Sequence, residues 1–160
     1  MQKKCIDLIL MLLLLSVSSL AQQMKFAGTH PPHPAVLQLL EREGAIMDSV
    51  TNVKERDSLR KELLSAGWFY HGIDGLPISH DGLTNRQTKN QFQLLEAKII
   101  SETLYQYETT AIFVSVFWQK NMDKGELREN YRSNLIVMGL ENGVWKMQAD
   151  IIGQNPKIKN

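Results

Sequence analysis

Apolar and polar residues alternate most regularly near the C-terminal end of the chain, on both sides of Asn142-Gly143. This dipeptide is the strongest short-range signal for a two-residue hairpin turn, because both central residues of that turn need a positive φ. A two-residue turn sets the register of its strands, and successive side chains point to opposite faces of the sheet. The register predicts a core face made of four facing pairs: Leu140 with Trp145, Met138 with Met147, Ile136 with Ala149, and Asn134 with Ile151.

The other face of this hairpin is mixed. It consists of Glu141 and Val144, Gly139 and Lys146, Val137 and Gln148, Leu135 and Asp150, and Ser133 and Ile152. In this register we expect Asp150 and Ile152 to point away from the core.

Apolar spacing in the first half of the chain predicts helices. In residues 35–50 apolar side chains recur every three or four positions and form one stripe. Asn52 starts a capping-box pattern for a second helix, which we expect to run to about Leu64. A similar pattern at residues 84–87 predicts a third, mostly polar helix that ends near Leu95.

Most of the chain outside these predicted helices has the pattern of β-strands. Residues 68–71, 99–107 and 111–119 combine β-branched and aromatic side chains, and Glu126 opens the long first strand of the hairpin. Helices followed by sequential antiparallel strands are typical of an α+β domain with its helices on one face of a sheet.

The first 21 residues have the pattern of a secretory signal peptide. Lys3 and Lys4 precede an apolar run over residues 6–15, and Ala21 ends a small-residue cleavage motif. A retained N-terminal anchor is the alternative, but the run is short of the ~20 residues that a membrane span needs. We expect cleavage after Ala21, no stable membrane anchor afterwards, and a secreted or periplasmic location.

Removal of residues 1–21 from the 160 leaves 139, which is enough for one domain with a real core. We divide them into an extended lead-in (22–34), the domain (35–153) and a tail (154–160). Of 18 Lys and Arg residues 16 remain, and of 17 Asp and Glu residues 16 remain, so no basic excess points to nucleic acid as a partner. Cys5 is the only cysteine, so the cleaved chain can form no internal disulfide.

Several segments, in their order, resemble the nuclear transport factor 2-like superfamily. They are the aromatic strand that ends at His71 with Asp74-Gly75 behind it, Ala111 after a tight turn, Tyr131-Arg132 at the start of a strand, and Gly143-Val144-Trp145 after the hairpin turn. The chain is most similar to the bacterial branch of small secreted domains of unknown function, whose relatives are polyketide-cyclase-like and ketosteroid-isomerase-like proteins. The long polar segment 76–90 departs from that pattern.

The resemblance implies a cone: a strongly curved antiparallel sheet wrapped around the N-terminal helices, with a cavity at the wide end. It also implies homodimers through the convex face of the sheet. Val137, Leu135 and Ile152 would be apolar residues on that face, and an exposed apolar patch usually marks an interface.

Arg132 and Asn134 extend the predicted core face towards the open end of the cone. An apolar cavity with a few convergent polar groups is the usual site for a small molecule, and a guanidinium suits a carboxylate. We therefore predict a site for a small, partly apolar ligand, made of Arg132, Asn134, Met138, Met147, Trp145 and Trp68. In the alternative, Arg132 pairs with a helix acid such as Asp48 or Asp57 and only closes the core.

His71 and Tyr70 are the catalytic candidates. A histidine side chain ordinarily titrates near neutrality, so His71 could act as a base, while Tyr70 or Arg132 could stabilise an oxyanion. His71 could equally be a strand-end residue bonded to the loop. Ketosteroid isomerases work with buried aspartates, but Asp150 faces outward in the predicted register, so we do not assign it a role.

His71, Asp74, His80 and Asp81 could be imagined as a metal site, but their spacing matches no zinc or calcium pattern. No metal or other cofactor is predicted. Three functions remain open: a ligand-binding domain without chemistry, which we favour, an acid–base enzyme of the isomerase, dehydratase or cyclase type, and a dimeric interaction module. A fold of this kind hosts all three.

Overall fold

The computed structural model describes residues 24–49, 52–72, 77–82, 92–123 and 125–155. The predicted signal peptide lies outside these residues. The two helices of the described part are α2 (Pro34–Ser49) and α3 (Val53–Lys61). Its strands are β1 (Met24–Gly28), β2 (Leu64–His71), β3 (Pro77–Ser79), β4 (Phe92–Gln106), β5 (Thr110–Asp123), β6 (Glu126–Glu141) and β7 (Val144–Asn155).

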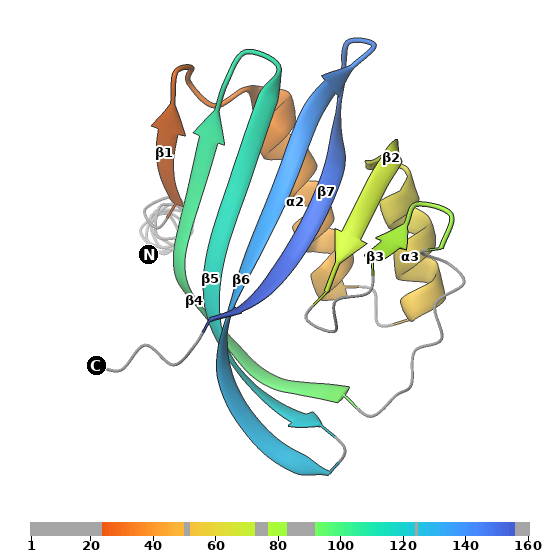
Figure 1. The fold of residues 1–160 in the computed structure, drawn as a ribbon, viewed down its shortest axis with the longest axis vertical. Coiled ribbons are helices and arrows are strands. Elements are labelled where there is room, and N and C mark those ends of the chain that lie inside the picture. Colours follow the sequence, from red (N-terminus) through yellow and green to blue (C-terminus); the bar gives the residue numbers. More distant parts are fainter. Residues whose placement is uncertain (1–23, 50–51, 73–76, 83–91, 124, 156–160) are drawn as a thin grey trace, which may run out of the picture.

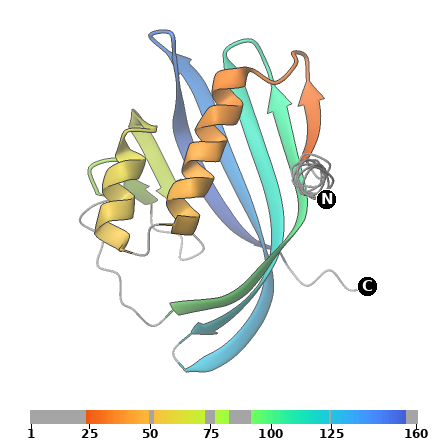
Figure 2. The same cartoon turned by 180° about the vertical axis from the view of Figure 1, so that it is seen from behind.

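The strands form a sheet in the order β1-β4-β5-β6-β7-β2-β3. Strands β4 to β7 are an antiparallel meander, while β1 joins β4 and β2 joins β7 in parallel. The sheet is curved, and both helices lie on its concave side (Figures 1 and 2). This confirms the predicted α+β class and the cone of a curved sheet around helices.

The N-terminal helices match their predictions closely. Helix α2 covers nearly all of the predicted range, and Asn52 caps α3: its side-chain oxygen accepts hydrogen bonds from the backbone N–H groups of Lys54 (3.0 Å) and Glu55 (3.2 Å). Neither described helix is both long and apolar enough to cross a membrane.

The third predicted helix is wrong where the structure describes it, because residues 92–95 belong to β4. Leu94 pairs with Asn121, and Glu96 with Lys120, on β5. Pairing along a long strand overrides the weak helical preference of the segment. Residues 83–91 lie outside the described part of the chain.

The extended lead-in contains β1, which pairs in parallel with the last five residues of β4, from Glu102 to Gln106. Gly28 has φ +102°, and a Cβ there would collide with the backbone of Gln106. The Gln106 carbonyl accepts bonds from the N–H groups of Thr29 and His30 (3.0 and 3.2 Å). These contacts fix the turn from β1 into α2.

The C-terminal hairpin has the predicted turn, with φ 51° at Asn142 and 79° at Gly143. The predicted pairs hold as far as Met138 with Met147. A β-bulge at Gln148 then adds one residue to β7, so the next pair is Val137 with Ala149.

The bulge reverses the two faces of β7 beyond it. Asp150 pairs with Ile136 and Ile152 with Asn134, so the predicted pairs Ile136–Ala149 and Asn134–Ile151 are wrong. Asp150 and Ile152 therefore lie on the concave face, contrary to the prediction.

The core packs the inner face of the helices on the concave face of the sheet. Its fully buried side chains include Val36 of α2, Leu63 before β2, Trp68 of β2, Leu104 of β4, Met138 of β6 and Met147 of β7.

Candidate functional site

A cavity of about 530 Å³ lies between α2 and the concave face of the sheet. Helix α2 contributes Leu37, Leu40, Glu41, Glu43, Gly44 and Met47. The other lining residues are Met24, Arg60, Tyr70, Glu102, Phe113, Asn134, Ile136, Asp150 and Ile152. The lining is thus largely apolar with a few polar groups.

Three charged side chains from three elements meet at the wall of this cavity. The Nη2 atom of Arg60 on α3 lies 2.7 Å from Glu43 Oε1 on α2 and 3.1 Å from Asp150 Oδ2 on β7. All three side chains are less than a tenth exposed. The Arg60 guanidinium also lies over the Trp68 ring, 5.9 Å from its centroid.

Burial by itself would lower the pKa of Arg60. The charges of Glu43 and Asp150, and hydrogen bonds to both, more than reverse this effect, so the pKa is raised above its ordinary value. Arg60 therefore stays charged, and the buried group of two carboxylates and one guanidinium carries one excess negative charge when both acids are ionised.

The buried atoms of the lining that accept no hydrogen bond from any described residue include Glu43 Oε2 and the side-chain oxygen Oδ1 of Asn134. A buried acceptor without a donor costs roughly 1–3 kcal/mol. Such atoms are therefore candidates for contact with a bound molecule.

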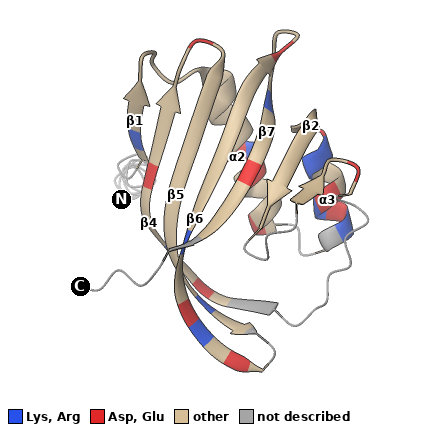
Figure 3. Ribbon diagram, viewed as in Figure 1, with Lys and Arg blue, Asp and Glu red and all other residues tan. Residues whose placement is uncertain are grey.

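Glu102 of β4 lines the side of the cavity opposite Asp150. Figure 3 shows acidic positions on both β4 and β7, at similar heights along the sheet. Burial raises the pKa of the Glu102 carboxyl above its ordinary value.

Gly44 is the small residue on the helix wall of the cavity. A Cβ built at this position has no neighbour within 4 Å, and the side chains of Leu37 and Met47 along the same helix are exposed. The cavity is therefore open towards solvent beside the middle of α2.

No family model matches the sequence, and no curated protein matches it. Solved structures do match. A nuclear transport factor 2-like protein from Cytophaga hutchinsonii is 13% identical, with a TM-score of 0.56 over 79% of this chain and 100% of that one. A protein described as a candidate ketosteroid isomerase from Shewanella frigidimarina is 13% identical, with a TM-score of 0.55 over 80% of this chain and 99% of that one.

A third match is a candidate Ca/calmodulin-dependent kinase II association domain from Exiguobacterium sibiricum, 15% identical, with a TM-score of 0.57 over 81% of this chain and 99% of that one. The chain has the nuclear transport factor 2-like fold. The fold that the resemblance implied is thus confirmed, and at these identities the likeness concerns the fold alone.

In this chain the two catalytic candidates lie on different faces of the sheet. Tyr70 pairs with Asp150 in the β2–β7 ladder and lines the cavity. His71 pairs with Ile151, is exposed and is not part of the cavity lining. The structure therefore brings Tyr70 together with Asp150, and not with His71. Asp74 lies outside the described residues.

Of the six predicted ligand residues, Asn134 lines the cavity. Trp68, Met138 and Met147 are fully buried in the core beside it. Trp145 lines a second hollow, of about 440 Å³, at the hairpin end of α2, and its ring centroid is 5.6 Å from that of His33.

Arg132 lies further along β6, opposite Phe117. With the Gln119 amide turned so that its oxygen faces Arg132, that oxygen accepts from Arg132 Nε at 2.9 Å and Nη2 at 3.2 Å. Arg132 is not part of the cavity lining.

Glu43 and Arg60 were not among the residues predicted from the sequence, and Asp150 was considered but set aside because the predicted register turned it outward. Glu43 had a visible signal, because it follows Val36 and Leu39 at helical spacing and so falls on the buried stripe of α2. The resemblance pointed to Asp150, but the face on which it lies depends on the bulge, which the sequence did not reveal. Among the described residues, no three His, Cys, Asp or Glu side chains are grouped so as to hold a metal ion.

Proposed function

We propose that this nuclear transport factor 2-like domain binds a small, partly apolar molecule in the cavity between α2 and the sheet. The observation that carries the proposal is the pair of buried acceptor atoms in the lining, Glu43 Oε2 and Asn134 Oδ1, which accept no hydrogen bond from any described residue. A bound molecule with suitable donors would satisfy both. The volume of about 530 Å³ is also in the usual range for small-molecule sites.

Gly44 supports the same function. A glycine in a helix interior costs roughly 1 kcal/mol relative to alanine, so its presence in the middle of α2 lowers the stability of the protein. Here it lines the cavity, and a Cβ at this position would meet no other atom within 4 Å.

A matched pair of variants at this position tests the proposal. Gly44→Ala should raise the free energy of unfolding by about 0.5–1 kcal/mol. Gly44→Leu should keep the fold but obstruct the cavity. Native mass spectrometry of the unmodified chain should show a co-purified small molecule, and crystals of it should show density in the cavity.

The co-purified molecule should remain in Gly44→Ala and be lost from Gly44→Leu. Equal occupancy in the two variants would place the molecule elsewhere and contradict the proposal. Urea denaturation monitored by tryptophan fluorescence provides the control that both variants are folded.

An acid–base enzyme is the second candidate, favoured by Glu102. A carboxyl whose pKa is raised by burial, in the same cavity as Tyr70 and Asp150, is an arrangement that active sites use. Chemical conversion of the co-purified molecule by the purified chain, lost in Glu102→Gln, would favour this candidate over binding alone.

A further inference from the structure

The charge of the cavity lining narrows the class of ligand. Glu41, Glu43, Glu102 and Asp150 line the cavity, and among its described lining residues only Arg60 is a cation. Arg60 is already held between two carboxylates. A ligand carboxylate would bring a third negative group to one guanidinium, which like-charge repulsion disfavours.

The hydrogen-bonding pattern points the same way. Glu43 Oε2 and Asn134 Oδ1 are both acceptors, so a ligand must bring donors to satisfy them. The described lining also has one buried donor without a partner, Arg60 Nε, but this guanidinium is already paired with two carboxylates. An ammonium group has donors and no acceptor, and its bond to a carboxylate is charge-assisted and stronger than a neutral bond.

The charge balance selects an ammonium over a neutral donor. The described lining holds four acidic side chains and one guanidinium, so its formal charge is negative, and a ligand cation beside Glu43 would reduce that charge. Burial alone raises the pKa of Glu102, so a cation in the cavity would also offset the cost of ionising that carboxyl.

We propose that the ligand is an amine that binds as its ammonium form, with the nitrogen beside Glu43 Oε2 and Asn134 Oδ1 and an apolar body against Phe113, Ile136 and Ile152. This inference rests on the proposed ligand-binding function and specifies the ligand's class. It also reverses the expectation from the sequence, in which Arg132 suited a carboxylate.

The test uses three probes that share one apolar body: 3-phenylpropylamine, 3-phenylpropan-1-ol and 3-phenylpropionate. Isothermal titration calorimetry at pH 7 should give an affinity for the amine at least about tenfold above that for the alcohol, with the carboxylate weakest. Glu43→Gln should weaken the amine by about tenfold and leave the alcohol within about twofold.

Two further variants keep the test decisive. Glu108→Gln removes an exposed acid in the β4–β5 turn, outside the cavity, and should change no affinity. If Glu43→Gln fails to fold, Glu102→Gln takes its place and should weaken the amine by at least about threefold.

The outcomes separate the two proposals. Tighter binding of the alcohol or the carboxylate, with loss of that binding in Gly44→Leu, would overturn the ammonium assignment and leave the ligand-binding function standing. Amine binding that none of the acidic variants weakens would also overturn the assignment. Failure of all three probes at millimolar concentration, together with no co-purified molecule, would overturn both.

Discussion

At the scale of single residues, the concave face holds more ionisable groups than a structural core needs. Burying a charged group is costly unless it is paired, and Glu43, Arg60 and Asp150 meet this condition by sharing one ion-pair group. Glu102 differs, because desolvation is what shifts its pKa. Its carboxyl therefore destabilises the fold when ionised, so the stability of the protein should depend on pH.

We expect Glu102→Gln to stabilise the protein at neutral pH. The folded state raises the pKa of Glu102 above its ordinary value of 4.5, so the folded state binds the proton more tightly than the unfolded chain. Stability of the unmodified protein should then fall as pH rises through and above 4.5. The variant should gain less than about 1 kcal/mol at pH 7, because solvent screens a partly exposed group.

Urea denaturation at pH 4 and pH 7 measures this difference. The advantage of Glu102→Gln should be small at pH 4, where the carboxyl is mostly protonated in both states, and larger at pH 7. Glu108→Gln is the matched control and should show no such trend. An advantage of Glu102→Gln that shrinks with rising pH would show that burial does not govern this carboxyl.

At the scale of elements, local signals predicted local structure. The stripe of α2, the Asn52 cap and the Asn142-Gly143 turn each depend on residues within a few positions, and each is where the sequence placed it. The start of β4 depends on pairing with the distant end of β5, and the bulge at Gln148 on a change of register within the β6–β7 hairpin, and neither has a local sequence signal.

The bulge explains why the site was only partly predicted. One extra residue in β7 moves Asp150 from the outer face to the cavity, where it meets Arg60. The side chain of Gln148 lies over Gly139 and donates to Glu141 Oε1 at 3.2 Å, so it occupies space that a residue larger than glycine would take. Asn134 lies on β6, the strand without the extra residue, and it lines the cavity.

The connection from β1 to α2 provides an element-scale prediction. Gly28→Ala should lower the free energy of unfolding by about 2 kcal/mol or more, because alanine is strained at positive φ and its Cβ would meet the Gln106 backbone. Gly125→Ala, also at positive φ but with nothing within 4 Å of its Cβ, should cost only about 1–2 kcal/mol.

Urea denaturation gives both losses, and hydrogen exchange at the β1 amides shows whether β1 detaches from β4. Because Met24 of β1 lines the cavity, Gly28→Ala should also weaken binding of a cavity ligand. Equal losses in the two variants would show that the contact with Gln106 contributes nothing.

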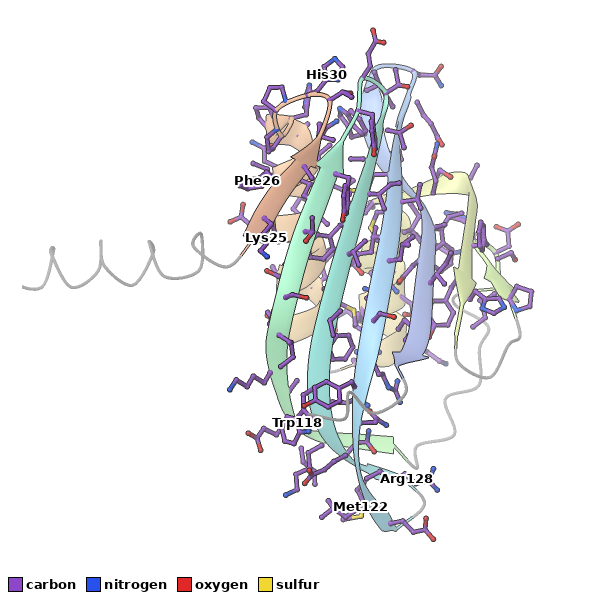
Figure 4. The ribbon with its side chains drawn as sticks, turned by 60° about the vertical axis from the view of Figure 1, so that its left-hand side comes forward. Lys25, Phe26, His30, Trp118, Met122 and Arg128 are labelled. Atoms are coloured by element: carbon purple, nitrogen blue, oxygen red, sulfur yellow. The ribbon has the colours of Figure 1, made fainter. Side chains whose placement is uncertain are left out.

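At the scale of the whole molecule, the sheet separates the cavity from an apolar outer face. Leu135 and Val137 of β6, Val114 of β5 and Ile151 of β7 lie on that outer face and are only partly covered. Ile151 takes the place predicted for Ile152, which lies in the cavity lining. Figure 4 looks onto this side of the sheet and shows Trp118 on it.

We propose that a second copy of the chain covers this outer face, because half-buried apolar side chains over three adjacent strands form the kind of patch that marks an interface. Sedimentation velocity of the chain at about 10 µM should show a dimer, since stable interfaces of standard size support micromolar or tighter association. Val114→Glu places a charge in the centre of the face and should weaken association by at least about 100-fold, because burying an unpaired carboxylate costs several kcal/mol.

Leu59→Glu, on the exposed side of α3, makes the same chemical change away from the sheet and should leave the dimer intact. A monomer at this concentration for the unmodified chain would contradict the proposal, and a Leu59→Glu effect equal to that of Val114→Glu would move the interface off the sheet.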